Sequence, residues 1–142
     1  MLELIDVHAH ILPRDWPNLA EKYGDPRFPV IVHTDGRHRI YKDGRFFREV
    51  WDSAWDAQAR IDDYARFGVQ VQVVSTVPVL FSYWAKPHQA LELHRHLNEH
   101  TAELCRKHPR HYAGIATVPM QSPNLAIQEM ERCINQLGLQ GV

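Results

Sequence analysis

The segment Ile5-Asp6-Val7-His8-Ala9-His10 limits the folds open to this chain more than any other, because a short apolar run ends there in two histidines. Side chains alternate along a β-strand, so His8 and His10 point to the same side of a strand that we expect at 2–7 and that ends at the histidines. At a rise of about 3.3 Å per residue, the two imidazoles stand about 6–7 Å apart and can bind one metal ion. At the carboxyl end of a barrel strand, that side is the mouth, where metals and substrates bind. We therefore predict a metal site at His8 and His10; the alternative is a chance pair among the ten histidines of the chain.

Strand and helix patterns alternate along the rest of the chain. Helices are expected at 56–67, 87–107 and 122–137, and further strands at 69–76, at 112–118 and from 139 onward. This alternation is typical of a parallel sheet with right-handed helical crossovers. No glycine-rich phosphate loop follows the first strand, and the histidine pair favours a barrel, which takes roughly 250 residues when complete. We predict an α/β fold that forms the N-terminal part of a (β/α)8 TIM barrel with about three βα units; an open doubly wound sheet is the alternative.

Three short apolar segments between the first strand and the first helix predict a small β flap. They lie at 30–33, 39–41 and 46–50, separated by Asp35-Gly36 and Asp43-Gly44. Asp-Gly between such segments is a strong hairpin signal. We place this inserted flap at about 23–52, within a single partial barrel domain that covers residues 1–142. The aromatic residues expected to fasten the flap to the barrel are Phe46, Phe47, Trp51 and Trp55.

Composition excludes several classes of function. The net charge of −1 lacks the basic excess of a nucleic-acid-binding protein. No apolar run approaches the roughly 20 residues of a membrane span, and no signal peptide precedes Asp6. The chain has two cysteines, far apart and outside any metal-binding or redox motif. We therefore expect a cytoplasmic protein that binds neither nucleic acid nor membrane.

The segment from Ile5 to Pro13, Ile-Asp-Val-His-Ala-His-Ile-Leu-Pro, resembles the opening of the metal-dependent amidohydrolase superfamily. Longer stretches resemble more narrowly its decarboxylases that act on 2-amino-3-carboxymuconate 6-semialdehyde. These stretches are Ser75 to Pro87, Phe47-Arg48 ahead of Trp55-Asp56, Val118 to Gln121, Glu129 to Cys133 and Gly138 to Val142. The resemblance covers essentially all 142 residues, but only the N-terminal part of the barrel of that family.

The resemblance implies a zinc-dependent, non-oxidative carboxy-lyase that acts on a small molecule in tryptophan–kynurenine-type catabolism. It implies that His8 and His10 bind the zinc ion, and that Arg48 binds a substrate carboxylate from the flap. The other metal ligands and the catalytic acid/base come from later strands in that family, so no catalytic residue is expected within this chain. Trp84 follows the second barrel strand; because such loops form the active site of a barrel, we expect it to contact substrate. A packed aromatic cover is its alternative role.

Two other functions stay open from the sequence. One is a metal-dependent hydrolase on the same scaffold; the other is an inactive, truncated fragment that binds metal weakly. Three barrel strands leave exposed edges, so we expect the chain to aggregate or to associate, as a homo-oligomer such as a dimer. Asp6 is a candidate to support a ligand histidine, and His96 and His100, four residues apart on a helix, are expected on a solvated face.

Overall fold

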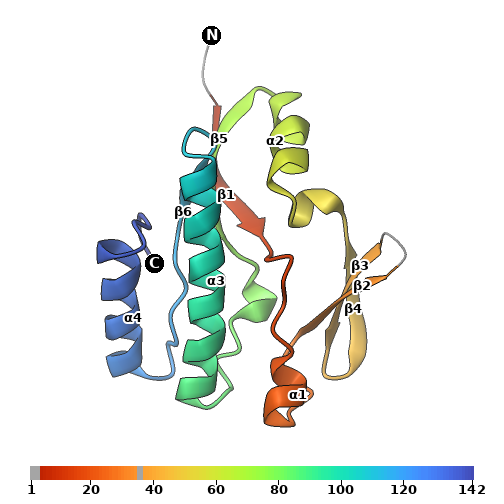
Figure 1. Cartoon of the computed structure of the whole chain (residues 1–142), viewed down its shortest axis with the longest axis vertical. Helices are drawn as coiled ribbons and strands as arrows, with labels where there is room; N and C mark the ends of the chain where they lie inside the picture. The colour runs from red at the N-terminus through yellow and green to blue at the C-terminus, as the bar shows by residue number, and fades with distance from the viewer. Residues whose placement is uncertain (1–3, 35–36) are drawn as a thin grey trace.

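The computed structural model describes residues 4–34 and 37–142. A parallel sheet with helices beside it forms one part of the molecule, and a small antiparallel sheet projects from its side (Figure 1). Its helices are α1 (Leu19–Tyr23), α2 (Ala57–Ala65), α3 (Pro87–Lys107) and α4 (Pro123–Asn135). Its strands are β1 (Leu4–Ile11), β2 (Val30–Thr34), β3 (Arg37–Lys42), β4 (Arg45–Val50), β5 (Val69–Thr76) and β6 (Tyr112–Gly114). None of the helices in the described ranges is both long and apolar enough to cross a membrane.

The parallel sheet has the strand order β1-β5-β6. β1 and β5 pair in parallel, as do β5 and β6, so α2 and α3 are the crossover helices. The predicted α/β class with a parallel sheet is confirmed. The helix bounds follow local signals: the Asp56 carboxylate accepts a hydrogen bond from the Ala59 backbone N–H at 2.8 Å, and Gly68 ends the α2 segment with φ 76°. Pro87 begins α3 as predicted.

Two predicted strand boundaries are wrong. β1 extends to Ile11, so the histidines lie inside the strand and not after it; the predicted start at 2 falls outside the described residues. β6 ends at Gly114, where 118 was predicted, because Ile115 forms only an isolated parallel bridge with Gly141. A strand needs a continuous ladder of hydrogen bonds to its neighbour, and the segment from 139 onward contributes this single bridge.

Helix α1 was not predicted. It has five residues, too few for an apolar period to be visible, and it is defined by its ends. The Asn18 side chain accepts a hydrogen bond from the Glu21 backbone N–H at 3.2 Å, and Gly24 adopts φ 63° at the carboxyl end. Asn followed three residues later by Glu, with Gly just beyond, is the sequence signal that marks it.

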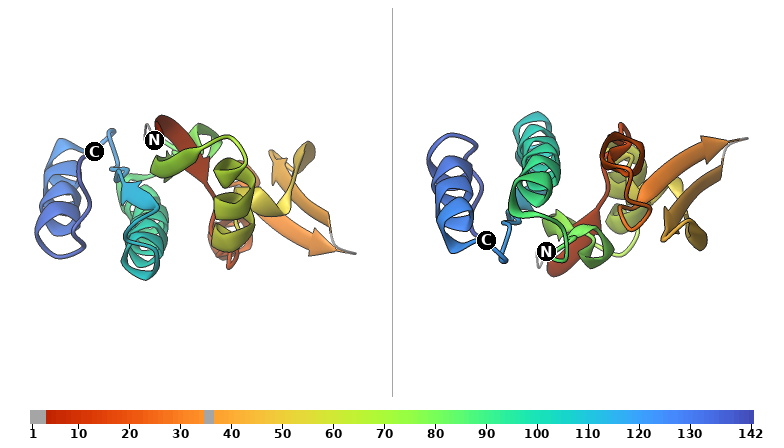
Figure 2. Two further views of the ribbon diagram at one scale, coloured as in Figure 1. Left: turned by 90° about the horizontal axis from the view of Figure 1, so that it is seen from above. Right: turned by 90° about the horizontal axis from the view of Figure 1, so that it is seen from below.

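The predicted flap is an antiparallel sheet with the order β2-β3-β4. Asp43 and Gly44 both have positive φ, 55° and 69°, as a two-residue hairpin turn requires. The other predicted turn, at 35–36, lies outside the described residues. Seen from above and from below, the flap stands at one end of the molecule and α4 at the other (Figure 2).

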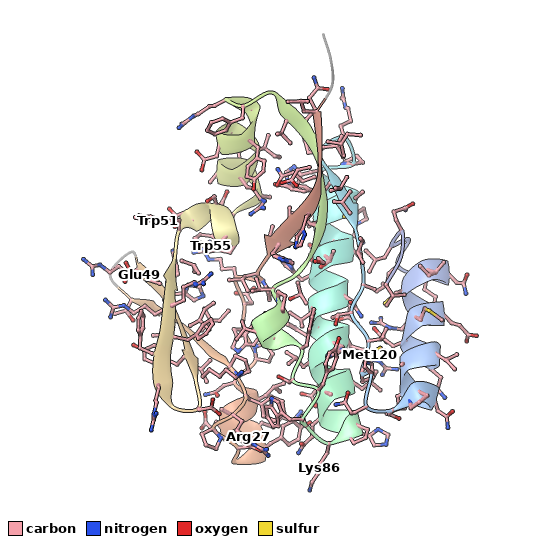
Figure 3. All side chains as sticks on the ribbon, turned by 180° about the vertical axis from the view of Figure 1, so that it is seen from behind. Arg27, Glu49, Trp51, Trp55, Lys86 and Met120 are labelled. Atoms are coloured by element: carbon pink, nitrogen blue, oxygen red, sulfur yellow. The ribbon has the colours of Figure 1, made fainter. Side chains whose placement is uncertain are left out.

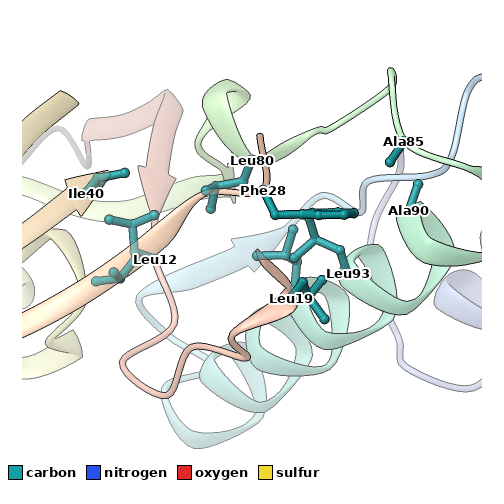
Figure 4. Packing of buried hydrophobic residues seen from close by; sticks show 10 residues of the cluster. Leu12, Leu19, Phe28, Ile40, Leu80, Ala85, Ala90 and Leu93 are labelled. Carbon is teal, nitrogen blue, oxygen red and sulfur yellow. The ribbon is translucent and has the colours of Figure 1, made fainter. Parts of the chain in front are cut away.

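The flap is fastened by aliphatic residues rather than by the predicted aromatic ones. Ile31 and Ile40 are buried in the largest core cluster, together with Leu12, Leu19, Phe28, Leu80, Ala85, Ala90, Leu93 and Leu97 (Figure 4). Of the four aromatic residues expected there, only Trp55 packs against this cluster, while Phe46, Phe47 and Trp51 are 58%, 48% and 84% exposed. Phe46 and Phe47 lie on β4, in which no residue is buried, and Trp51 follows it, whereas β2 and β3 supply the buried Ile31 and Ile40. Figure 3 shows Trp51 and Trp55 where the flap meets the rest of the chain.

A buried polar network holds the segment after β6, around Thr117, in place of a continuous ladder of strand hydrogen bonds. Asn98 on α3 donates to the Thr117 carbonyl and accepts from the Thr117 backbone N–H, both at 2.8 Å. Its amide also donates to buried Glu129 on α4 at 2.8 Å, and Arg132 donates to the same carboxylate at 2.8 Å. Burial by itself raises the pKa of Glu129. The hydrogen bonds from Arg132 and Asn98 lower this pKa by more than burial raises it, so the net shift is downward. An ionised carboxylate thus ties α3, α4 and this segment together.

His96 and His100 do not lie on a fully solvated face. Both are half-buried and line a cleft of about 510 Å³ beside α3, and His96 Nε2 donates to the Asp15 carbonyl at 2.8 Å. Burial, and next the neighbouring His96, lower the pKa of His100 to about 4. His100 is therefore neutral in the folded chain at neutral pH.

We expect His100 to make the chain less stable in mild acid. An unfolded histidine has a pKa of about 6.5, so between that value and the folded pKa of about 4 the unfolded state binds more protons. The contribution is complete above pH 6.5 and is lost as the pH falls, by at most about 3 kcal/mol in the free energy of unfolding. Urea unfolding at a series of pH values checks this. The variant His100→Gln is expected to flatten the profile between these two pKa values, and an unchanged slope would contradict the assignment.

The free edge of β1 leads us to expect self-association. Among the described residues β1 pairs only with β5, and Leu4, Ile5 and Val7 are 49%, 58% and 74% exposed. An apolar strand edge is a template for pairing with another chain. Light scattering coupled to size exclusion is expected to show dimers or larger species, and Val7→Lys to reduce them. A monomer at all concentrations would contradict this expectation.

Candidate metal centre

A β-bulge places the histidine pair on β1. Asp6 pairs with Gln72 and Ala9 with Val74, so three steps along β1 match two along β5, with Val7 and His8 in between. The Asp6 carboxylate accepts a hydrogen bond from the His8 backbone N–H at 3.0 Å. Asp6, which the sequence suggested as support for a ligand histidine, therefore contacts the backbone of His8 and not its imidazole ring. Bulges of this kind redirect side chains and are frequent beside active sites.

The two imidazoles lie close together on one side of β1. His8 Nε2 and His10 Nε2 are 3.2 Å apart, and the ring centroids are 5.0 Å apart at an interplanar angle of 88°. Two nitrogen ligands at 2.0–2.1 Å from a tetrahedral zinc ion are separated by about 3.3 Å. The separation of the two Nε2 atoms therefore matches that of two nitrogen ligands of one zinc ion. Without a metal ion, a hydrogen bond between the two Nε2 atoms gives the same spacing.

His10 is the more firmly held member of the pair. It is half-buried, and its Nδ1 lies 3.1 Å from Ser75 Oγ on β5, while the His8 ring is exposed. Burial, followed by the nearby His8, lowers the pKa of His10. A lowered pKa favours the neutral imidazole, which is the form that binds a metal.

Among the residues that the structure describes, these two histidines are the only candidate metal ligands brought together at this point. Within residues 4–34 and 37–142, no group of three or more His, Cys, Asp or Glu side chains is arranged to hold a metal ion. Catalytic zinc sites usually have three protein ligands and one exchangeable position. The described residues therefore supply an incomplete centre.

A largely apolar groove of about 440 Å³ opens beside Ser75. One wall comes from the end of β5 and the residues after it, the other from the segment after β6 and from α4. Its lining residues include Ser75, Thr76, Phe81, Tyr83, Thr117, Val118, Met120 and Met130. The Phe81 and Tyr83 rings stack with centroids 5.2 Å apart. Because Ser75 contacts both His10 and this space, the groove and the histidine pair are neighbours.

Among the described residues, the other two predicted site residues have no hydrogen bond, ion pair or ring contact with the histidine pair. Arg48 is exposed on β4, with its guanidinium 5.7 Å from the Phe47 ring centroid, and no hydrogen bond or ion pair among the described residues joins it to either histidine. Trp84 packs edge-on against Phe28, with centroids 4.8 Å apart, and lies beneath the Arg27 guanidinium at 4.3 Å. About a third of its surface, 36%, stays exposed. Their contacts with substrate stay predictions.

Sequence reasoning missed Ser75 as part of the centre. The signal was available in principle, because β1 and β5 were both predicted as parallel strands whose carboxyl ends meet at one edge of the sheet. The register that pairs His10 with Ser75, however, depends on the bulge at Val7 and His8. A bulge leaves no clear mark in this sequence.

Known proteins resemble the chain along nearly its whole length. A family model described as Amidohydrolase matches residues 5–142. The chain is 45% identical over 139 residues to 2-amino-3-carboxymuconate-6-semialdehyde decarboxylase of Dictyostelium discoideum, covering 97% of this chain and 39% of that protein. It is 42% identical over 125 residues to the Caenorhabditis elegans protein of the same name, covering 87% of this chain and 31% of that protein. The chain therefore spans less than half the length of these relatives.

Solved structures share the fold. A 2,6-dihydroxybenzoate decarboxylase in complex with 2,6-dihydroxybenzoate superposes with a TM-score of 0.65 at 24% identity, over 100% of this chain and 39% of that one. The 5-carboxyvanillate decarboxylase of Sphingomonas paucimobilis superposes with a TM-score of 0.67 at 18% identity, over 100% of this chain and 42% of that one. Because the family model spans residues 5–142 and two relatives are 45% and 42% identical, the chain belongs to the amidohydrolase family.

Proposed function

We propose that this chain is the N-terminal part of a (β/α)8 barrel that acts as a zinc-dependent, non-oxidative decarboxylase of 2-amino-3-carboxymuconate 6-semialdehyde. The observation that carries the proposal is the convergence of His8 Nε2 and His10 Nε2, 3.2 Å apart, on the first strand of the parallel sheet. The names of the two relatives at 45% and 42% identity support the reaction and the substrate. The alternation of β1, α2, β5, α3, β6 and α4 around a parallel sheet supports the barrel.

The chemistry of the two proposed ligands limits the choice of metal ion. Imidazole nitrogens suit zinc as well as several other divalent ions. Related decarboxylase structures from Novosphingobium aromaticivorans and Polaromonas are described with manganese, which supports a divalent metal as a class. A divalent ion bound by His8 and His10 supplies Lewis-acid stabilisation of negative charge on the substrate. We propose zinc, with manganese as the competitor to test.

Residues of the chain bind and orient the substrate in this proposal. Arg48 on the flap is free to form a bidentate ion pair with a substrate carboxylate, because the described residues give its guanidinium no carboxylate partner. The exposed part of the Trp84 indole contacts the planar substrate, while the rest of it packs on Phe28. His10, kept neutral by burial, stays available as a ligand.

A hydrolase on the same scaffold is the alternative activity, because the family model that matches the chain is described as Amidohydrolase. The two reactions differ in their products: a decarboxylase releases carbon dioxide, and a hydrolase consumes water. Because the described residues provide two ligands, either activity needs additional ligands from outside them. An inactive fragment is the remaining alternative.

We further propose a homo-oligomer in the cytoplasm, where the free thiols of Cys105 and Cys133 stay reduced.

The metal content of the purified chain tests the proposed centre. We expect about one zinc ion per chain by mass spectrometry, and its loss in the double variant His8→Ala/His10→Ala, because both Nε2 ligands are removed. The double variant His96→Gln/His100→Gln is the matched control, since it removes another close histidine pair and leaves the proposed ligands in place. Zinc that survives the first double variant but not the second would overturn the proposal.

Carboxylate binding tests the role of Arg48. We expect a muconate-type dicarboxylate to bind the chain, and Arg48→Gln to weaken binding roughly tenfold, because charge-assisted hydrogen bonds contribute about 1.5–3 kcal/mol. Isothermal titration calorimetry measures the change. Arg110→Gln, at an exposed arginine after α3 and outside the flap, is expected to bind as the parent does. Equal losses in the two variants would show a general effect of charge and not a site.

A further inference from the structure

Ser75 lies directly behind one of the two proposed metal ligands. It is the Cα partner of His10 in the parallel pairing of β1 with β5, and its Oγ is 3.1 Å from His10 Nδ1. Ser75 is half-buried and sits one residue before the end of its strand, so its position is fixed by the sheet. The other ring nitrogen of His10, Nε2, faces His8.

The contact with Ser75 is linked to the tautomer of His10, because a hydroxyl can accept from Nδ1–H or donate to an unprotonated Nδ1. A neutral imidazole has one N–H donor and one acceptor, and the hydrogen bond at one nitrogen decides the state of the other. When Nδ1–H donates to Ser75 Oγ, the lone pair of Nε2 is left free and directed towards His8. That is the tautomer in which Nε2 binds a metal ion.

The two ligands differ in how they are held. Among the described residues, the only ring contact of His8 is with His10, and Asp6 binds its backbone N–H and not its ring. His10 has Ser75 on one side and His8 on the other. His10 is therefore the oriented ligand, while the exposed His8 ring is free to adjust.

We propose that Ser75 is a positioning residue that fixes the tautomer and ring orientation of His10 for metal binding. This inference rests on the proposed metal site at His8 and His10. Ligand histidines commonly donate their other N–H to a partner that raises affinity for the metal, and loss of such a partner typically costs 10–100-fold. A serine hydroxyl on the neighbouring strand serves as that partner in this chain.

The tautomer of His10 is measurable without any metal. Two-dimensional ¹⁵N correlation spectra of the imidazoles, recorded with chelator at a pH where His10 is neutral, distinguish a protonated from an unprotonated ring nitrogen. In the parent chain we expect His10 to carry its proton on Nδ1. Ser75→Ala is expected to move the population towards Nε2–H, and Ser75→Thr, which keeps a hydroxyl, to restore it. An unchanged tautomer in Ser75→Ala would overturn the proposal.

Zinc affinity is the second readout. Isothermal titration calorimetry with zinc alone is expected to show roughly tenfold or weaker binding in Ser75→Ala, and near-parent binding in Ser75→Thr. Thr76→Val is the matched control, because the neighbouring Thr76 is 3% exposed and its hydroxyl has no hydrogen-bond partner among the described residues. A general loss of packing would lower affinity in both variants, and that result would overturn a positioning role.

The same titrations separate this inference from the function on which it rests. If His8→Ala/His10→Ala loses zinc while Ser75→Ala binds as the parent does, the metal site stands and the role of Ser75 is wrong. If His8→Ala/His10→Ala binds zinc as the parent does, the metal site is wrong, and the role of Ser75 in metal binding fails with it. If both variants lose affinity and Thr76→Val does not, both are supported.

Discussion

The parallel pairing of β1 with β5 is the interaction on which the candidate centre depends. This ladder places Ser75 beside His10, and a one-residue bulge at Val7 and His8 interrupts it just before that pair. His8 and His10 lie two residues apart on β1, and their Nε2 atoms are 3.2 Å apart. The bulge leaves the His8 backbone N–H outside the regular ladder, and Asp6 satisfies it. The sheet therefore holds His10 between Ser75 on one side and His8 on the other.

Two different kinds of contact join the flap and the helices to one another: aliphatic packing and a buried polar network. Aliphatic burial joins the flap to α3 through Ile40 and Leu93, in the cluster that also contains Phe28. A buried polar network joins α3 to α4, and Asn98 and Glu129 are its central members. The network contacts the segment after β6, one wall of the groove beside Ser75, so a stable wall exists where the ladder has only a single bridge.

Much of the fold could be predicted from local signals. The 21 residues of α3 begin at a proline and carry a regular apolar stripe, and Asp43-Gly44 needs the backbone of a tight hairpin, so both were predicted correctly. The short helix α1, the end of β6 and the fastening of the flap were not. The last two depend on partners far away in the chain: the sequence pattern predicts a buried aromatic residue at Trp51, yet Trp51 follows an edge strand and is 84% exposed. Helix α1 has local caps but only five residues, too few to show an apolar period.

The sequence by itself determined the family, the α/β class and the identity of the two histidines, because these follow from residue types and from spacing within one segment. Only the tertiary structure decided that the two Nε2 atoms converge, that Ser75 contacts His10, and that among the described residues Arg48 and Trp84 have no hydrogen bond, ion pair or ring contact with the pair. Strand register decides which side chains of two strands meet, and register depends on the pairing of segments about 65 residues apart, as with His10 and Ser75. Local pattern selects the elements, whereas the long-range ladder positions their side chains.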